Sequence, residues 1–574
     1  MERSGQLVSR EEIASRLWGN GVHVDVESGV NTAVRKLRAA LKDAADQPTF
    51  IETVPGKGYR FIGPVSESGQ PQVAVKAHRG APWYAAGIAL GIVATIGVVY
   101  NAGFRPRGPV VQADSLTVVV LPFENLSSDP EQEYFSDGLM EETIAALGRV
   151  APSSIRVIAR TTSMAYKKTT KTASQIGGEL GAGHLIESTV RRDGESVRVT
   201  SKLIRVKDQV QVWGQTFARK PSDLVGVPQE IATAVARQID SELSSLPRQS
   251  PRKSTRDSVA QDLYLKGRFY LYQRTPQAMQ KSAEYFAAAI QKDSSYALAF
   301  AGLADTYILQ SLITSVYSSE HENKLRLAIE KALALDPDLA EAHTAAGMAS
   351  FFIDWNWPAA ERSFRRAIEL NPSYASARQF YAHLLASSLR HDEAIAEIQR
   401  AREIDPFSPM MQSFEGGVLV WARRYGEALP PLQKAIAIDP NFFPAHSALG
   451  LLHQQTQKPD AAIKEYRNAY RLSGGNILQL ANQGFLFGFT GRRTEAQEII
   501  HTMNQIAESR FVPPVTFALV YAGLGENDTA FQWLEKAYQI RDIGLVLLTV
   551  DPKWDSLRSD KRFQSLLRRC GFLN

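Results

Sequence analysis

The chain has 574 residues, of which 44% are hydrophobic and 22% charged, and its net charge is +5. This composition excludes a collagen-like, largely disordered or polytopic membrane protein, and the length predicts roughly four domains. Cys570 is the single cysteine, so an internal disulfide framework is excluded as well.

Two helices are predicted within the first 42 residues. The first, over 9–18, begins with a capping box in which Ser9 is followed three positions later by Glu12. The second, over 28–42, has one apolar stripe at helical spacing: Val30, Val34, Leu37 and Leu41. Its other faces carry four basic residues and no acidic one: Arg35, Lys36, Arg38 and Lys42.

A β-hairpin is predicted next, from the β-rich runs 50–54 and 59–62 around the glycine-containing turn 55–58. Lys57 lies at the tip of this hairpin, and Arg60 lies just beyond it. A basic helix fits the major groove of DNA, which is about 12 Å wide, and a basic hairpin reaches phosphate or the adjacent minor groove. The alternative is a solvated helix face that contacts no nucleic acid.

These elements resemble the OmpR/PhoB-type winged-helix domain, a phosphorelay-type effector domain, and in particular that of the membrane-tethered CadC/ToxR-like regulators. Three runs carry the resemblance: Val30-Asn31-x-Ala33-Val34-Arg35-Lys36-Leu37-Arg38-x-x-Leu41, Phe50-Ile51-Glu52-Thr53-Val54 and Gly58-Tyr59-Arg60-Phe61. The resemblance implies that 28–42 is the recognition helix and 51–61 the wing. The residues it implies for DNA contact are Thr32, Arg35, Lys36, Arg38, Lys42, Lys57 and Arg60.

The resemblance covers residues 5–63, so the predicted DNA-binding domain is 1–63. The first sheet and first helix of the family's domain have no counterpart in this sequence. We therefore expect an N-terminally incomplete winged helix, whose missing part lies either upstream of Met1 or is absent.

A single transmembrane helix is predicted over 80–104, after a linker over 64–79. These 25 residues between Arg79 and Arg105 carry no charge, and about 20 helical residues cross a hydrocarbon core of about 30 Å. Trp83, Tyr84 and Tyr100 lie near the ends, where aromatic residues anchor such helices. The alternative is a buried core helix.

Residues 115–245 are expected to form an α/β domain. Strands are predicted over 116–121, 155–158, 184–192, 195–206 and 210–218, and helices over 133–147, 172–180 and 226–245. The runs 120–126, 133–139 and 212–215 resemble the TolB-like (FlgO-like) domain of bacterial regulators, which implies a sensing or docking role. Relatives of that domain also accompany nucleotide cyclase domains, but no region here is free to be one.

The remaining chain repeats with a period of about 34 residues after a linker over 246–258. Asp336-Pro337, Asn371-Pro372, Asp405-Pro406 and Asp439-Pro440 close successive repeats. Small residues recur inside them: Ala332, Ala367, Ala401, Ala435 and Ala469, and also Ala360, Ala394, Ala428 and Ala462. The pattern resembles the tetratricopeptide repeat (TPR) and predicts seven or eight helix pairs over 259–550 with a helical cap over 551–574.

The sequence therefore predicts a multidomain α+β chain: a partial winged helix, one transmembrane helix, an α/β domain and an all-α TPR solenoid. The favoured function is a one-component transcription regulator in the bacterial inner membrane, with its N-terminus cytoplasmic and its C-terminal region outside the cytoplasm. Expected partners are double-stranded DNA, the membrane, a protein or peptide in the TPR groove, and a second copy of the chain.

The alternative function is a membrane-anchored TPR scaffold without DNA binding. An enzymatic function is not favoured, because the sequence contains no nucleophile, acid–base pair or metal cluster, and no cofactor is predicted. The histidines of the repeats, His343, His383, His446 and His453, lack metal-ligand spacing and are expected to pack in the core or groove.

Overall fold

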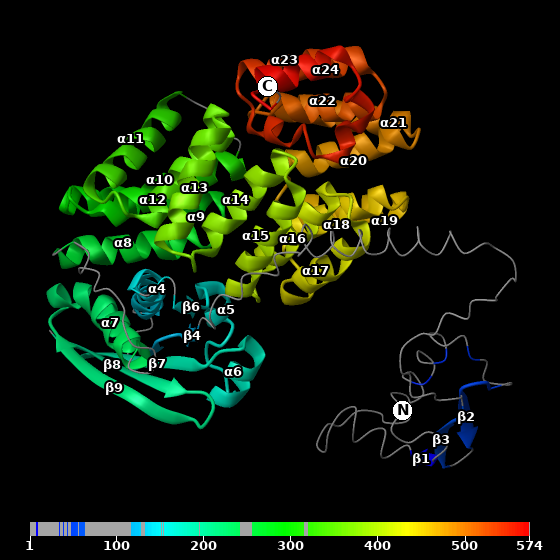
Figure 1. Cartoon of the computed structure of the whole chain (residues 1–574). Helices are drawn as coiled ribbons and strands as arrows, with labels where there is room; N and C mark the ends of the chain where they lie inside the picture. The colour runs from blue at the N-terminus through cyan, green and yellow to red at the C-terminus, as the bar shows by residue number, and fades with distance from the viewer. Residues whose placement is uncertain are drawn as a thin grey trace, which may run out of the picture. The chain divides into compact units, whose positions relative to one another are not determined.

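The computed structural model describes residues 7–9, 34, 38, 43, 48–54, 57–62, 116–127, 133–150, 152, 154–193, 196–240, 255, 257–314 and 319–572. The chain divides into two compact units, Met1–Gly108 and Pro109–Asn574 (Figure 1). The predicted transmembrane helix 80–104 and the linker 64–79 lie outside the described residues. Among the helices that are described, none is both long enough and apolar enough to cross a membrane.

The first unit contains a three-stranded antiparallel sheet in the order β1-β3-β2. The strands are β1 (Leu7–Ser9), β2 (Ile51–Val54) and β3 (Gly58–Phe61), so the predicted hairpin is confirmed. β1 was not predicted, because three residues carry too little alternation to identify a strand. Ser9, the expected start of a helix, is the last residue of β1, and the rest of that predicted helix lies outside the described residues.

A small hydrophobic core holds this unit together. Val34 is helical, as predicted for 28–42, and it packs with Ile51 of β2 and Tyr59 of β3. Phe50 and Phe61 flank this cluster, with ring centroids 6.4 Å apart. Val34, the one residue of the predicted apolar stripe that the structure describes, therefore packs against the hairpin.

The second unit begins with a six-stranded mixed sheet in the order β6-β4-β7-β8-β9, with β5 pairing alongside β7. The strands are β4 (Leu116–Val120), β5 (Glu124–Asn125), β6 (Ile155–Val157), β7 (His184–Asp193), β8 (Ser196–Arg205) and β9 (Val210–Arg219). β4 runs parallel to β6 and β7, whereas β7, β8 and β9 form an antiparallel meander. The five predicted strands lie within two residues of the observed ones, and β5 was not predicted.

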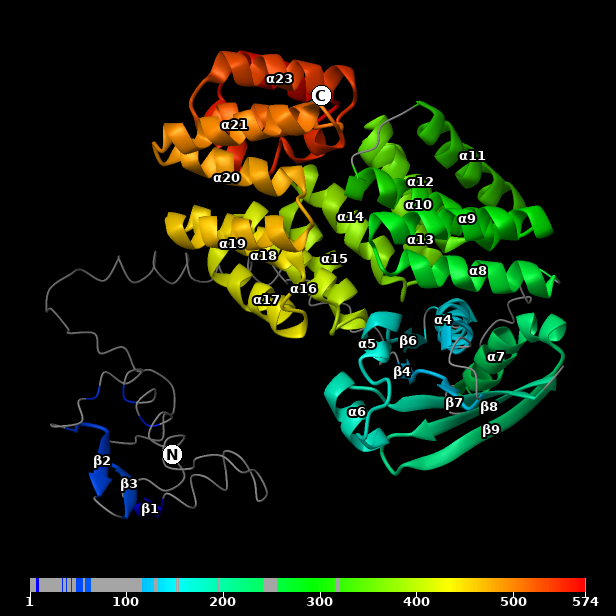
Figure 2. The same ribbon diagram turned by 180° about the vertical axis from the view of Figure 1, so that it is seen from behind.

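Helices α4 (Glu133–Val150) and α7 (Val227–Asp240) cover one face of this sheet, α6 (Ala173–Leu180) covers part of the other face near β4, and the outer face of β8 and β9 is exposed (Figures 1 and 2). Val118 and Val120 of β4 pack in the cluster that includes α4 and α7. Val119, which points to the opposite face, packs with Ile176 of α6. The short helix α5 (Arg160–Met164) follows β6, and a 3-10 turn, η2 (Pro221–Gly226), precedes α7. The alternation along β4 thus buries one strand between two helical layers.

Eight antiparallel helix pairs follow among the described residues and form a TPR-like solenoid. The pairs are α8 (Ser258–Leu271) with α9 (Pro276–Lys292), α10 (Ala297–Thr314) with α11 (Ser319–Leu335), α12 (Ala340–Ala349) with α13 (Trp357–Leu370), α14 (Ala375–Ser387) with α15 (His391–Ile404), α16 (Pro409–Trp421) with α17 (Tyr425–Ile438), α18 (Phe443–Gln455) with α19 (Pro459–Leu472), α20 (Ile477–Phe489) with α21 (Arg493–Ala507) and α22 (Pro514–Gly523) with α23 (Asn527–Gln539). A π-helical turn, η3 (Ser350–Asp354), extends α12.

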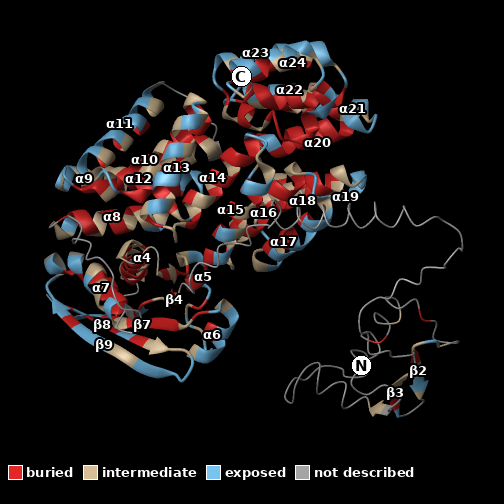
Figure 3. Cartoon of the chain, in the orientation of Figure 1, coloured by how far each residue is buried: buried red, intermediate tan, exposed pale blue. Residues whose placement is uncertain are grey.

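The periodic small residues lie where the helices cross. All nine predicted alanines are fully buried, and the buried faces of neighbouring helices meet along the whole solenoid (Figure 3). Gly450 of α18 shows why the position must be small. A Cβ atom there would lie 2.7 Å from the ring of Tyr466 on α19, closer than side chains tolerate. The period of 34 residues is therefore set by helix–helix contact.

The end of the chain folds back onto the middle of the solenoid. Two 3-10 turns, η4 (Ile543–Leu547) and η5 (Pro552–Leu557), and α24 (Lys561–Arg569) follow the last helix pair. The Thr549 hydroxyl donates to the Ser387 carbonyl (2.6 Å), and the Trp357 indole N–H donates to the Cys570 carbonyl (3.1 Å). These contacts join residues more than 150 positions apart. The last segment therefore packs against earlier repeats and does not form a further helix pair.

Candidate nucleic-acid interface and binding surfaces

The two basic residues of the hairpin, Lys57 and Arg60, differ in their surroundings. Lys57 is exposed in the turn between β2 and β3. Arg60 pairs with Glu52 across the two strands, with 3.1 Å between the guanidinium and the carboxylate. Lys57 is therefore available for a phosphate contact, whereas the charge of Arg60 is already balanced by a neighbour.

Arg38 has a structural contact that the sequence did not predict. Its guanidinium donates to the Ile51 carbonyl and to the Thr53 hydroxyl of β2, both at 2.8 Å. These hydrogen bonds tie the basic helix to the wing. A substitution of Arg38 therefore removes these two hydrogen bonds as well as a positive charge.

Asp43 is a buried carboxylate that the sequence analysis missed. It accepts hydrogen bonds from the backbone N–H groups of Thr49 (2.6 Å), Phe50 (3.1 Å) and Ile51 (2.8 Å), and thereby fixes the start of β2. Burial acts to raise the pKa of the Asp43 carboxyl, but these three donors and the Arg38 guanidinium lower the pKa below its usual value. These contacts span six to eight residues, so no short-range sequence pattern marks Asp43 as the partner of this backbone.

The other expected DNA contacts, Thr32, Arg35, Lys36 and Lys42, lie outside the described residues. The structure therefore brings together Arg38, Lys57 and Arg60 around one hairpin and gives each a different environment.

The α/β domain is fastened to the solenoid by buried polar contacts. The backbone N–H and the hydroxyl of Thr162 both donate to Asp405, at 2.9 and 2.8 Å, and the same hydroxyl accepts the Phe407 N–H at 2.9 Å. The Ala159 N–H donates to the Ile404 carbonyl at 2.9 Å. Burial raises the pKa of the Asp405 carboxyl, and the donors from Thr162 oppose that rise.

A second set of contacts joins α4 to the first repeats. Glu141 forms an ion pair with Arg268 and accepts a hydrogen bond from the Tyr272 hydroxyl at 2.7 Å. Tyr264 donates to Glu142 at 3.0 Å. Farther along, burial raises the pKa of the Asp305 carboxyl to about 7, and the neighbouring Arg268 guanidinium opposes that rise. Two carboxylates of α4 therefore bond to the first helix of the solenoid and its C-terminal end.

A groove of about 270 Å³ lies along the first helices of four successive pairs. It is lined by residues of α16, α18, α20 and α22, including Phe414, Trp421 and Leu451. Gly544, Leu547 and Trp554 from the C-terminal segment form its other wall. The chain's own end therefore occupies part of the surface on which we expected a peptide.

Two of the four repeat histidines, His383 and His446, pack inside the repeats. His383 lies among Phe351, Phe352, Phe414 and Trp421, and burial lowers its pKa to about 3, so it stays neutral. His446 contacts Glu465 at 2.6 Å and the Pro440 carbonyl at 3.0 Å. Within the described ranges, no group of three or more His, Cys, Asp or Glu residues could hold a metal ion.

Comparison with known proteins shows a similarity that covers the N-terminal residues 1–61. Residues 1–61 match the family model described as "Transcriptional regulatory protein, C terminal". The transcriptional activator CadC of Escherichia coli (strain K12) is 35% identical over 68 residues, which is 11% of this chain and 12% of CadC. The N-terminal residues 1–61 are therefore similar to the OmpR/PhoB-type DNA-binding domain of transcription regulators such as CadC.

Longer matches cover more of the chain at lower identity. The transcriptional regulator HilA of Salmonella paratyphi A (strain ATCC 9150 / SARB42) is 22% identical over 404 residues, covering 69% of this chain and 63% of HilA. A putative adenylate cyclase of Rhizobium meliloti (strain 1021) is 29% identical over 191 residues, covering 33% of this chain and 32% of the cyclase. The chain thus covers about one third of the length of the cyclase and less than two thirds of the length of HilA.

Among solved structures, the APC/C hetero-tetramer Cut9-Hcn1 is similar to 60% of this chain and 59% of its own, with 19% identity and a TM-score of 0.38.

Proposed function

We propose that this protein is a membrane-anchored one-component transcription regulator. The N-terminal domain, of the OmpR/PhoB type, would bind promoter DNA in the cytoplasm. The uncharged run 80–104 would cross the inner membrane once. The α/β domain and the TPR solenoid would then lie outside the cytoplasm and respond to a signal or a protein partner. The observation that carries the proposal is the basic-tipped wing, packed on a helical residue of the predicted recognition helix, within the matched residues 1–61.

DNA contact is divided between the helix and the wing in this proposal. The basic faces of 28–42 would enter the major groove, and the exposed Lys57 would contact phosphate. Arg38 would act mainly by holding the helix against β2, because its guanidinium is already bonded to Ile51 and Thr53. Arg60 would contribute less than Lys57, because Glu52 balances its charge.

The signal would reach DNA through a change in pairing between two copies of the chain. Two tethered DNA-binding domains that are held together bind two half-sites with a raised effective concentration. The hydrogen bonds between Thr162 and Asp405 and the ion pair between Glu141 and Arg268 support this scheme, because they couple the α/β domain to the repeats. A conformational change in the α/β domain would therefore alter the conformation of the repeats, and the reverse.

The proposal is tested by capturing cross-linked DNA from cells that express the full chain. The wild type is compared with a double variant, Arg35→Ala and Lys36→Ala, which removes helix charge without touching the Arg38 contacts. Lys207→Ala, an exposed lysine between β8 and β9, is the matched control. We expect discrete promoter regions to be enriched by the wild type and the control and lost in the double variant. Absence of any enriched region in the wild type would refute DNA binding.

A second candidate function is a TPR scaffold that binds a protein partner without regulating transcription. The observation that favours it is the groove of about 270 Å³ with its apolar wall of Phe414, Trp421 and Leu451. Under this function, partner capture would be lost in Trp421→Ala but would not change in the Arg35→Ala and Lys36→Ala variant, and no promoter would be enriched. The two candidate functions therefore differ in their readouts. The regulator loses promoter capture in the Arg35→Ala and Lys36→Ala variant, whereas the scaffold loses partner capture in Trp421→Ala.

A further inference from the structure

The groove on the solenoid is closed on one side by the chain's own C-terminal segment. One wall comes from the first helices α16, α18, α20 and α22, and the other from Gly544, Leu547 and Trp554. The ion pair of Arg423 with Asp555, at 2.8 Å, fastens this second wall to the repeats. The volume of the groove is about 270 Å³, which at about 30 Å³ for each water-sized group holds on the order of ten non-hydrogen atoms. The space that is left therefore suits a small molecule.

The walls of the groove are mainly apolar, and several of the residues in them are aromatic. Phe414 and Trp421 of α16 lie edge to face, with ring centroids 5.8 Å apart. Phe443 and Leu451 of α18 and Trp554 of the C-terminal segment add to this lining. Aromatic rings pack favourably against one another in offset or edge-to-face arrangements. An aromatic ligand would therefore find ring partners on both walls.

The charges in the groove are already balanced within the chain. Among the described residues that line it, the charged ones are Asp551 and Lys553. Their side chains are paired at 2.7 Å, and both residues are buried. A charged ligand would lose its hydration here without meeting an unpaired opposite charge, which is unfavourable. The groove therefore favours a ligand without net charge.

One buried polar atom in the groove lacks a partner. Asn482 of α20 lines the groove and is 3% exposed, and its Nδ2 donates to Oε1 of Gln479 at 3.3 Å. Its Oδ1 is buried and accepts no hydrogen bond within the part of the chain that the structure describes. Buried polar atoms in native proteins are nearly always paired, and an amide oxygen can only accept. The partner that this oxygen calls for is therefore an N–H or O–H group.

We propose that this groove binds a small, uncharged aromatic compound that carries one N–H or O–H donor, of the size of indole. Its ring would pack among Phe414, Trp421 and Trp554, and its donor would pair with Oδ1 of Asn482. Because the ligand would touch the first helices of the repeats and the C-terminal segment at once, it would strengthen the contact between them. As the class of signal, this inference rests on the regulator proposed above, but binding itself does not depend on DNA recognition.

The test is ligand-observed NMR with the full chain in lipid nanodiscs, and empty nanodiscs give the baseline. The probes are indole, benzofuran, in which an oxygen replaces the indole N–H, and benzoate as a charged counterpart.

Three variants separate the contributions to binding. Gly417→Leu fills the groove, because Gly417 lines it and a Cβ atom there meets open space. Gly426→Leu is the matched control, since Gly426 of α17 is exposed, has open space at its Cβ and does not line the groove. Asn482→Leu removes the buried acceptor. Hydrogen exchange of α18 and α20 establishes that each variant is folded.

We expect indole to bind the wild type and the Gly426→Leu control about two- to tenfold more tightly than benzofuran, because a neutral hydrogen bond to Asn482 is gained. Benzoate should bind more weakly than either. Asn482→Leu should bring indole and benzofuran to equal affinity, and Gly417→Leu should weaken both about tenfold or more. Absence of indole binding, unchanged binding by folded Gly417→Leu, or benzofuran or benzoate binding the wild type as tightly as indole would each overturn the proposal. None of these results bears on promoter capture, so this proposal and the regulator can fail separately.

Discussion

Replacing Thr162 by valine should loosen the contact between the α/β domain and the solenoid. The two side chains have nearly the same shape, so the change removes mainly one hydroxyl. That hydroxyl donates to Asp405 at 2.8 Å and accepts the Phe407 N–H at 2.9 Å. A hydrogen bond to a charged group contributes about 1.5–3 kcal/mol, and a buried N–H left unpaired costs about 1–3 kcal/mol. Because the Thr162 N–H still bonds to Asp405, we expect a net loss of about 3 kcal/mol.

Hydrogen exchange measured by mass spectrometry reports this loss locally. A decrease of about 3 kcal/mol in the free energy of opening corresponds to about a hundredfold faster exchange. The peptides to follow contain Ala159, whose N–H crosses the interface, and Phe407. Thr170→Val, at an exposed position of the same domain, controls for the substitution itself. Exchange of these peptides that stays within about threefold of the wild type would refute the reasoning.

Three further predictions follow from single residues. Gly450→Ala places a methyl group 2.7 Å from the ring of Tyr466 and should destabilise the repeats by about 1–3 kcal/mol in urea unfolding, whereas Gly417→Ala, with open space at its Cβ, should not. Burial raises the pKa of Asp305 to about 7, so folding favours its protonated form. The contribution of Asp305 to stability, of the order of a few kcal/mol, is full below about pH 4 and is lost as pH rises from about 4 through 7. Hydrogen exchange of α10 should show this decline in the wild type but not in Asp305→Asn. Lys57→Gln should weaken binding to every DNA sequence alike and reduce the magnitude of the salt slope by about 1 in anisotropy titrations.

Local patterns were enough to predict most elements of the fold. The alternation of Val197 and Val199 with Arg198 and Thr200 identified β8 and the face of the sheet that it buries. In the repeats, a small residue at a helix crossing leaves a period that is visible along the chain, as at Gly450 and the alanines. The hairpin of the first unit was equally visible, because a turn between two β-rich runs is a local signal.

Contacts between distant segments left no such pattern. Thr162 and Asp405 are 243 positions apart, and neither residue type is unusual where it stands. The return of Thr549 to Ser387 depends on the curvature of the whole solenoid, which no single repeat encodes. The charge of Arg38, which predicts a DNA contact, is visible in the sequence, whereas its hydrogen bonds to β2 depend on how the helix packs.

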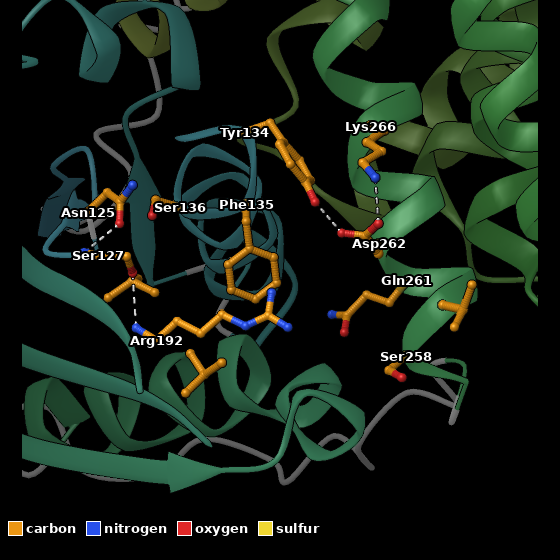
Figure 4. Close-up of a pocket in the computed structure, with 13 residues that line it drawn as sticks. Asn125, Ser127, Tyr134, Phe135, Ser136, Arg192, Ser258, Gln261, Asp262 and Lys266 are labelled. Carbon is orange, nitrogen blue, oxygen red and sulfur yellow. Dashed lines mark hydrogen bonds and ion pairs between the residues drawn. The ribbon is translucent and has the colours of Figure 1, made fainter. Parts of the chain in front are cut away.

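The same limit applies to the pocket of about 350 Å³ between the α/β domain and α8 (Figure 4). Ser136 and Gln261, which line it, are ordinary helical residues in the sequence, and folding buries both at one interface. Tyr134 and Asp262, which meet across that interface, are 128 positions apart. A pocket lined by two domains is invisible until their arrangement is known.

The central claim, that the N-terminal domain recognises specific DNA, is tested most directly by the ratio of two affinities. The full chain in detergent is titrated, at about physiological salt, with a captured promoter fragment and with the same fragment in shuffled order. The account predicts that the promoter fragment binds at least about a thousandfold more tightly, as specific sites do. Equal affinities for the two fragments at every salt concentration would contradict it.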